Sequence, residues 1–248
     1  MTNAATNGRR RNPKMSEVIA RELATHIVEA GLAPGSVLPT EREMIESFAV
    51  GRATIREALR LLETRNVITI RPGPGGGPVV RRPRPCDLGE ALSLILQFED
   101  ASLDDVMEAR RALEPMIARL AAERISDAEI EVLDETVRLI EASPEDPEVF
   151  HEQNRTFHST LCRAAHSVVL EVFLDSLASV ADGVSGGVTY SPRRYLAAAR
   201  MHATIVTALR ARDGAAAEQA MREHMDETRA YWHKKYRDLA SRPVVWRG

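Results

Sequence analysis

The chain has 248 residues, of which 44% are hydrophobic and 28% charged, and its formal net charge is −3 at pH 7. This length allows one or two domains with a well-packed core. No apolar run is long enough to span a membrane and no charged-then-apolar leader opens the chain, so nothing in the sequence suggests export or membrane insertion. The two cysteines, Cys86 and Cys162, lack C-x-x-C spacing, so we expect a cytoplasmic protein without disulfide bonds.

The charges are distributed unevenly along the chain. Residues 1–85 contain 14 Lys and Arg against 8 Asp and Glu, a balance of +6, whereas residues 86–248 contain 19 against 28, a balance of −9. A basic N-terminal part on an acidic body is typical of a protein that meets phosphate groups with one domain only.

Two segments precede the densest group of arginines. Residues 1–14 are polar and aperiodic, which predicts a disordered basic arm that either contacts a phosphate backbone or has no role. Residues 15–31 have the period of an amphipathic helix that ends at a glycine. The predicted apolar stripe of this helix comprises Val18, Ile19, Leu23, Ile27 and Val28.

Residues 38–65 predict two short helices joined by a tight turn. Thr40-x-x-Glu43 is a capping-box pattern, so the first helix should begin there, with Ile45 and Phe48 on its inner face. The second helix follows the turn at 49–51, and its apolar residues recur at helical spacing. Its predicted buried face comprises Ile55, Ala58, Leu59 and Leu62.

The outer face of the second helix carries arginines. Arg52, Arg56 and Arg60 point outward there, which is the arrangement that a recognition helix needs in order to place guanidinium groups in a major groove. The alternative is a solvated basic face on an ordinary helix. The next segment, a β-rich run at 67–70, a glycine- and proline-rich tip at 71–78 and Val79-Val80, predicts a wing. Helix, helix-turn-helix and wing in this order predict a winged helix-turn-helix domain over residues 15–80, followed by a proline-rich linker at 81–85.

Three stretches, LPTERE, VGRATIREALRLLE and ITIRPG, resemble the DNA-binding domain of the GntR family of bacterial transcription regulators. The resemblance covers about the first third of the chain. It implies that Arg42, Arg52, Thr54 and Arg56 are DNA-contacting positions and that Gly73 is the wing-tip glycine. Gly51 departs from the pattern, because the family usually has Ser or Thr there. A helix cap and a phosphate-contacting hydroxyl are therefore missing.

From residue 86 almost every segment has helical periodicity. Seven predicted helices span 87–98, 102–124, 127–142, 146–165, 167–182, 192–212 and 214–240. Without a convincing strand, they imply an antiparallel helical bundle over residues 86–240, with a loop near 184–191 and a tail at 241–248. The predicted fold class is therefore mainly α, with a small β wing in the N-terminal domain.

Three of the seven histidines share features that point to a metal site. His158 lies at i, i+4 from Asn154 on an apolar face, and His202 and His224 also lie on apolar faces. His202 precedes Asp213 by 11 residues and His224 follows Gly214 by 10. At ~1.5 Å per residue both lie roughly 15 to 16 Å from the turn, so they should face each other across a helical hairpin.

A single inward histidine is more often a hydrogen-bonded core residue, but three of them beside an amide oxygen favour a metal ion. We expect Zn²⁺, with Ni²⁺ or Mn²⁺ as alternatives. Arg110 is the candidate to hold a carboxylate beside the metal, because its guanidinium offers two donors. The alternative for Arg110 is a salt bridge to Glu114 or Glu108.

This set of residues resembles the FCD effector-binding domain of the FadR subfamily of GntR regulators. Arg110-x-x-x-Glu114, Asn154-x-x-x-His158, His202 and His224 match its pattern in order and spacing, over most of residues 86–240. The resemblance implies that Asn154, His158, His202 and His224 are metal ligands and that Arg110 contacts the effector. Asn154 stands where the family more usually has Asp. The neutral ligand should lower the affinity for the metal.

Together these features predict a ligand-responsive transcription regulator, most simply a repressor, rather than an enzyme. A homodimer would present two winged domains to a pseudo-palindromic site on double-stranded DNA, and a small organic acid would alter its affinity for that operator. The alternative is a metal-dependent hydrolase or lyase that carries a DNA-binding domain. Against it, the stretch HEQNR at 151–155 lacks the second histidine of H-E-x-x-H.

Overall fold

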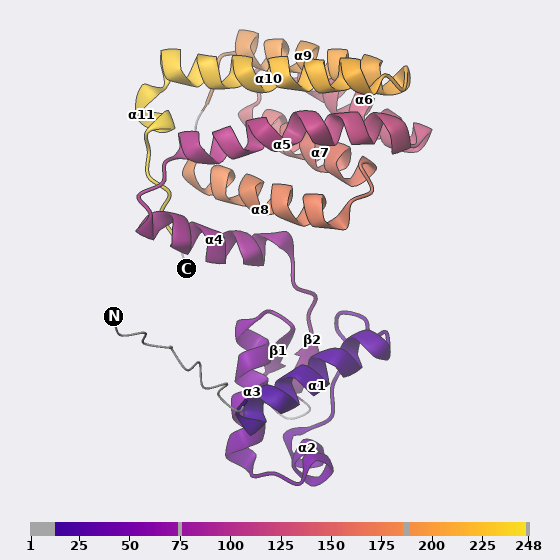
Figure 1. The fold of residues 1–248 in the computed structure, drawn as a ribbon, viewed down its shortest axis with the longest axis vertical. Coiled ribbons are helices and arrows are strands. Elements are labelled where there is room, and N and C mark those ends of the chain that lie inside the picture. Colours follow the sequence, from indigo (N-terminus) through magenta and orange to yellow (C-terminus); the bar gives the residue numbers. More distant parts are fainter. Residues whose placement is uncertain (1–12, 74–75, 186–188, 247–248) are drawn as a thin grey trace, which may run out of the picture. The chain divides into compact units, whose positions relative to one another are not determined.

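The computed structural model describes residues 13–73, 76–185 and 189–246, and the chain divides into two compact units, Met1–Pro83 and Arg84–Gly248. Most of the arm predicted at 1–14, part of the wing tip and part of the loop predicted at 184–191 lie outside the described residues. The prediction of a mainly α-helical chain with a small β wing is confirmed (Figure 1). Within the described ranges, no helix combines the length and the apolar character needed to cross a membrane.

The first unit is a three-helix domain with a two-stranded wing. Its helices and strands are α1 (Met15–Glu29), α2 (Glu41–Phe48), α3 (Arg52–Thr64), β1 (Ile68–Arg71) and β2 (Gly77–Val80). The strands pair antiparallel, with Ile68 opposite Val80 and Arg71 opposite Gly77. Gly31, just past the end of α1, has φ +61°, a left-handed conformation that glycine adopts at little cost.

The apolar faces of α1, α2 and α3 form the core of this unit. All four residues predicted to be buried on α3 are buried. On the other helices one prediction was wrong and one was incomplete. Val28 is 79% exposed, because it points away from the face of α1 on which Ile19, Leu23 and Ile27 are buried. In α2 the fully buried residue is Met44, while Ile45 and Phe48 pack against the edge of the core.

The second unit is an antiparallel bundle of longer helices. These helices are α4 (Pro85–Phe98), α5 (Leu103–Arg124), α6 (Asp127–Ala142), α7 (Pro147–Ala164), α8 (Val168–Ser185), α9 (Pro192–Arg210), α10 (Gly214–Lys235) and α11 (Arg237–Ala240). Helix α10 packs against both α5 and α9, and α4 packs along α8 (Figure 1).

Two helix boundaries of the bundle differ from the prediction. The helix predicted over 214–240 breaks at Tyr236, whose backbone is not helical at φ −135° and ψ 51°, so that α11 is a separate turn. Helix α8 continues through Gly183 to Ser185, three residues beyond the predicted end. Neither change is readable from periodicity, since one glycine weakens a helix without ending it.

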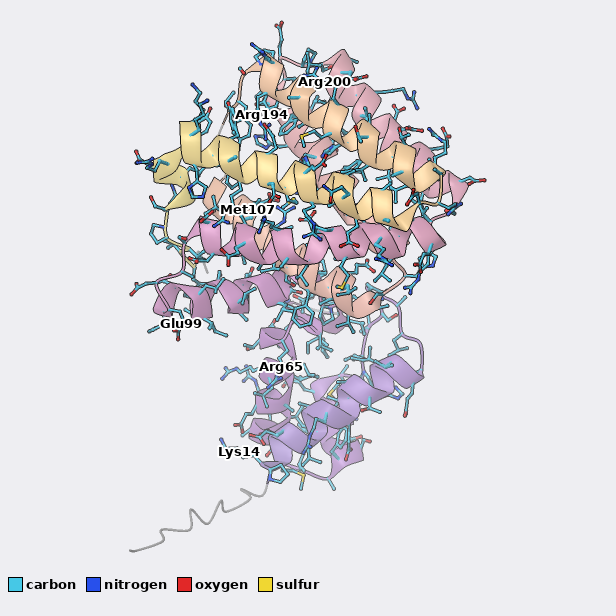
Figure 2. The ribbon with its side chains drawn as sticks, turned by 45° about the horizontal axis from the view of Figure 1, so that its top comes forward. Lys14, Arg65, Glu99, Met107, Arg194 and Arg200 are labelled. Carbon is cyan, nitrogen blue, oxygen red and sulfur yellow. The ribbon has the colours of Figure 1, made fainter. Side chains whose placement is uncertain are left out.

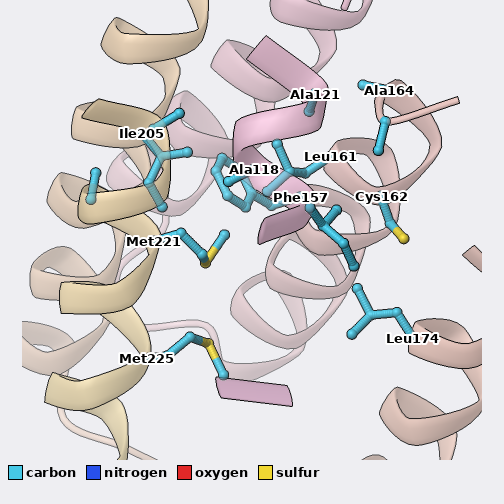
Figure 3. Close-up of a cluster of buried hydrophobic side chains, with 14 of the residues drawn as sticks. Ala118, Ala121, Phe157, Leu161, Cys162, Ala164, Leu174, Ile205, Met221 and Met225 are labelled. Carbon is cyan, nitrogen blue, oxygen red and sulfur yellow. The ribbon is translucent and has the colours of Figure 1, made fainter. Parts of the chain in front are cut away.

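The bundle core lies between α5, α7, α9 and α10. Phe157, Ile205 and Met221 converge there from three of these helices, and Ala118 and Ala121 of α5 allow close packing (Figure 3). The segment after α11 also belongs to this unit, because the N–H of Val244 donates to the carbonyl of Ala101 at 2.9 Å and the side chain of Val244 is buried.

Candidate functional site

The end of α2 and the start of α3 create the surface of the helix-turn-helix. The N–H of Glu43 donates to the hydroxyl of Thr40, and the N–H of Thr40 donates to the Glu43 carboxylate at 2.7 Å, so the predicted capping box is present. Ala49 then takes a left-handed conformation with φ +50°. This residue ends α2, and α3 begins at Arg52.

The arginines predicted to contact DNA lie on an open surface. Arg52 and Arg56 are exposed on α3, and Thr54 between them is half-buried. The Nε atom of Arg56 lies 3.7 Å from the Glu41 carboxylate, and that of Arg42 lies 3.1 Å from the Glu46 carboxylate. Exposed pairs of this kind contribute little to stability, so a phosphate group can replace the carboxylate.

Two glycines shape the ends of this surface. Gly51 is the N-cap of α3, its backbone is extended, and no side chain caps the helix. The residue that departs from the GntR pattern therefore leaves α3 uncapped. Gly73 at the wing is exposed and has φ +95°, a conformation that favours glycine strongly over other residues.

The structure brings His158 of α7, His202 of α9 and His224 of α10 together in the bundle. All three side chains are buried, and the ring centroids of His202 and His224 are 4.8 Å apart. The centroid of His158 lies 5.4 Å from each of the other two. Phe157 stacks on His202 with a centroid distance of 3.8 Å, which holds that ring in place.

The nitrogen atoms of these rings fit a metal ion. One nitrogen from each ring can be chosen so that all three lie within 4.8 Å of one another, and the Nε2 atoms of His158 and His224 are 3.4 Å apart. Nitrogens bound to a tetrahedral Zn²⁺ at ~2.1 Å lie about 3.4 Å from one another. Within the described residues, both nitrogens of His202 and Nδ1 of His224 are buried without a hydrogen-bond partner. Buried polar atoms without partners are costly, and a bound ion would satisfy one of the two nitrogens of His202, since each ring offers an ion one ligand atom.

Glu114 of α5 orients this group, a role that the sequence analysis did not assign to it. The Nδ1 atom of His158 donates to the Glu114 carboxylate at 2.5 Å, and the Nε atom of Arg110 donates to its other oxygen at 2.7 Å. Because an ionised carboxylate only accepts, the proton of His158 lies on Nδ1 and its Nε2 lone pair faces the other histidines. Arg110 therefore makes the alternative salt bridge, and it also lines the pocket.

Burial and charge control ionisation at this site. Burial alone would raise the pKa of Glu114, but the charge of Arg110 and the bond from His158 hold it at about 2. Burial, with a smaller effect from His158, lowers the pKa of His224 to about 3, and burial lowers that of His202 well below its usual value. At neutral pH the carboxylate is charged and both of these imidazoles are neutral, which is the form that binds a metal.

A pocket opens beside the histidines. Asn154, His158, His224 and Arg110 line it, and its volume is about 80 Å³, enough for several waters or a small anion. Met107 and Arg194, both labelled in Figure 2, also line it. The remaining lining residues are Phe150, His151, Ala181, Asp182, Tyr190, Ala198, Met225, Thr228 and Trp232.

Sequence reasoning missed two polar residues of this pocket. Arg194 is buried, its guanidinium pairs with Glu227 and lies 4.4 Å from the centroid of the Tyr231 ring. Arg194 lies eight residues before His202, about two helical turns, so the sequence already places both on the same face of α9. His151 packs against Phe150 and also lines the pocket.

Comparison with known proteins assigns both units to families. Residues 15–76 match the family described as bacterial regulatory proteins, gntR family, and residues 105–227 match the FCD domain. The chain belongs to the GntR family. As a GntR regulator with an FCD domain it has a helix-turn-helix of the DNA-binding type, and the resemblance drawn from the sequence is confirmed.

Relatives of this GntR chain match it over most of their length. The HTH-type transcriptional repressor NanR of Citrobacter rodentium is 28% identical over 236 residues, covering 89% of this chain and 86% of the relative. The galactonate operon transcriptional repressor of Escherichia coli is 28% identical over 205 residues, covering 80% and 88%. The solved structure of Streptococcus agalactiae GntR is 29% identical with a TM-score of 0.70, covering 87% of this chain and 99% of that one. These are regulators, so the chain is a transcription regulator and the enzyme alternative is not supported.

Proposed function

We propose that this GntR regulator is a repressor whose helical unit binds a divalent metal ion together with a small organic acid, and that the acid alters its affinity for operator DNA. The observation that carries the proposal is the cluster of three buried histidines, of which His158 and His224 line a pocket, with nitrogens of His202 and His224 that have no hydrogen-bond partner among the described residues. A pocket with this donor set is suited to sensing a ligand through a metal.

Four residues would hold the metal. His158, His202 and His224 supply nitrogen donors, and Asn154 on the same pocket wall supplies an amide oxygen. A nitrogen-rich set favours Zn²⁺, with Ni²⁺ or Mn²⁺ also compatible. The ion would provide a positive centre that attracts a carboxylate.

Arg110 would receive the same carboxylate. Its side chain is 12% exposed and lines the pocket, its Nε donates to Glu114, and Nη1 makes only a weak bond to the sulfur of Met107 at 4.0 Å, which a carboxylate oxygen would replace. Because a relative is named for a galactonate operon, hydroxylated acids belong among the first ligands to test. The polar pocket wall, with Tyr190 and Thr228, is compatible with such acids.

The winged domain would contact the operator through Arg42, Arg52, Thr54, Arg56 and Gly73. The exposed arginines of α3 support major-groove contacts, and Gly73 allows the backbone of the wing to approach DNA closely. In a homodimer, two such domains would read two half-sites.

A second copy of the chain would cover an apolar surface of the helical unit. Ile95 and Phe98 on α4 are 60% and 81% exposed, and Leu88 and Leu94, also exposed, lie on the same face of this helix by their spacing. A row of exposed apolar residues on one helix face is characteristic of an association surface. Multi-angle light scattering should therefore report a dimer that Phe98→Glu converts to a monomer, and a wild-type monomer at micromolar concentration contradicts this assignment.

The test of the proposed function joins metal content to operator affinity. Elemental analysis should find close to one divalent ion per wild-type chain and none in the His202→Ala/His224→Ala double variant. Fluorescence anisotropy with operator DNA should then show release by a hydroxylated acid only for the metal-loaded wild type. The double variant should bind the operator without responding to the acid.

His233→Ala is the matched control, since His233 is exposed on α10 and pairs with Asp104 away from the pocket. This variant should keep both the metal and the response. Unchanged metal content in the double variant would overturn the metal site. A response to the acid that survives loss of the metal would overturn the sensing role.

A further inference from the structure

The pocket beside the three histidines is already balanced in charge. Each ionised arginine or carboxylate on its wall has an oppositely charged partner. The pairs are Arg110 with Glu114, Arg194 with Glu227 and Asp182 with Arg155. A dication placed at the histidines therefore brings two charges for which the pocket has no compensation.

The ligand set itself carries no negative charge. Histidine nitrogens and the Asn154 amide are neutral donors, and within the described residues no carboxylate or thiol joins the cluster of His158, His202 and His224. Glu114 lies behind the His158 ring, on Nδ1, so it acts through that ring. Asp182 is about half exposed and its Oδ2 is 2.8 Å from the Nε atom of Arg155.

Burial makes this imbalance costly. The three histidines are at most 6% exposed, so an ion among them loses most of its hydration. A charge without a counter-charge in a poorly solvated site is strongly disfavoured, whereas an anion in direct contact restores much of the lost energy. Three histidines and the amide would fill a tetrahedral site, so such an anion would bind as a fifth ligand or in place of the weak, neutral Asn154 amide.

We propose that the metal and the acid bind this chain as a coupled pair, because the carboxylate of the acid supplies the anionic ligand that Asn154 cannot supply. The inference rests on the proposed function and specifies how its site is regulated. Without the acid the metal is held weakly, and without the metal the acid is held weakly. The regulator then responds to the two ligands together.

Linkage fixes the form of the effect. If the acid tightens metal binding by a given factor, the metal tightens acid binding by the same factor. A direct contact between opposite charges at reduced dielectric is strong enough that we expect a factor of roughly ten or more. Asn154→Asp places a carboxylate at the same position, so this variant should bind the metal tightly without the acid and lose most of the coupling.

The experiment is a Co²⁺ titration of the metal-free full-length chain, followed by the visible absorption of the bound ion. It is run in potassium acetate and in potassium chloride at equal ionic strength, with free Co²⁺ corrected for the weak acetate complex. Wild type should bind Co²⁺ roughly ten times more tightly, or better, in acetate than in chloride. Asn154→Asp should bind it tightly in both salts, and the change of spectrum on adding acetate should be reduced.

Gln153→Glu is the matched control, because it adds the same charge to α7 one residue away, at a position that does not line the pocket. It should keep the acetate dependence of the wild type. Equal Co²⁺ affinity of the wild type in acetate and chloride would overturn the coupling while leaving the metal site intact. Absence of Co²⁺ binding in both salts would overturn the metal site and the coupling with it. If Asn154→Asp does not fold, the comparison of Co²⁺ affinity in acetate and in chloride still tests the coupling with the wild type alone.

Discussion

Replacing Glu114 with Gln removes the charge that joins Arg110 to His158 in the bundle. The carboxylate is 1% exposed and accepts bonds from both side chains. The amide has nearly the same shape, so packing is conserved while the ion pair is lost. What remains is an arginine that is 12% exposed without its counter-charge, and a His158 ring whose proton position is no longer fixed.

The size of the effect follows from the pKa of Glu114, which is about 2 in the folded chain against a usual 4.5. This difference corresponds to about 3 kcal/mol of folding free energy at neutral pH. Removing one partner of a buried pair typically costs 3–5 kcal/mol, which agrees. Because the folded pKa is lowered, the contribution is complete above pH 4.5 and is lost as the pH falls toward 2. About half has gone near pH 3.2.

Urea unfolding followed by tryptophan fluorescence measures the free energy of unfolding of the helical unit, which contains Glu114. Both tryptophans of the chain, Trp232 and Trp246, lie in the helical unit, so their emission reports on that unit alone. The experiment uses chelator-treated protein, so that metal binding does not contribute. Glu114→Gln should lower the free energy of unfolding by about 3 kcal/mol at pH 7. The difference in the free energy of unfolding between wild type and Glu114→Gln should become smaller as the pH falls.

Glu108→Gln provides the matched control on the same helix. The Glu108 side chain is 66% exposed and lies 3.3 Å from Arg229, so its loss should cost less than about 1 kcal/mol. A cost for Glu114→Gln no larger than that of this control would refute the reasoning. A gap between wild type and Glu114→Gln that stays constant from pH 7 to pH 3.2 would refute it as well.

Three further predictions concern both units. Arg52→Ala and Arg56→Ala should each weaken operator binding by about 1–3 kcal/mol in fluorescence anisotropy. Arg65→Ala, at the far end of α3, should not weaken it. Equal losses of affinity in all three variants would contradict the recognition-helix assignment. A Cβ added at Gly51 meets no atom within 4 Å, so Gly51→Ser should cap α3, raise stability by a few tenths of a kcal/mol and tighten operator binding; weaker binding would contradict this. Burial lowers the pKa of His224 to about 3, so protonation of this residue in the unfolded chain should cost the metal-free wild type about 2 kcal/mol of stability between pH 7 and pH 5. Urea unfolding should show that His224→Gln does not have this loss. An equal loss of stability in wild type and variant would contradict the prediction.

Local patterns were sufficient to predict the winged domain and one part of the candidate metal site. The capping box at Thr40 and the apolar spacing of α3 depend on neighbours within one or two turns, so the sequence displays them directly. His202 and His224 could be paired because the turn at Asp213-Gly214 fixes the level of each on adjacent antiparallel helices. Counting residues from this one turn was enough to predict that His202 and His224 face each other.

Contacts between helices that are distant in the sequence could not be predicted in this way. Glu114 and His158 are 44 residues apart, and their bond depends on how α5 and α7 rotate about their axes when they pack. The same applies to Arg194, whose partner Glu227 lies 33 residues away. Periodicity assigns a residue to a face of its own helix, but it does not say which residue of another helix will oppose it.

Native mass spectrometry of the protein as purified from cells tests the central claim most directly. The account predicts a species whose mass exceeds that of the chain by one divalent metal ion and one small carboxylic acid, with both additions absent from the His202→Ala/His224→Ala variant. A wild-type chain without added metal after purification in metal-supplemented buffer would contradict it. So would an identical pattern of additions in the variant.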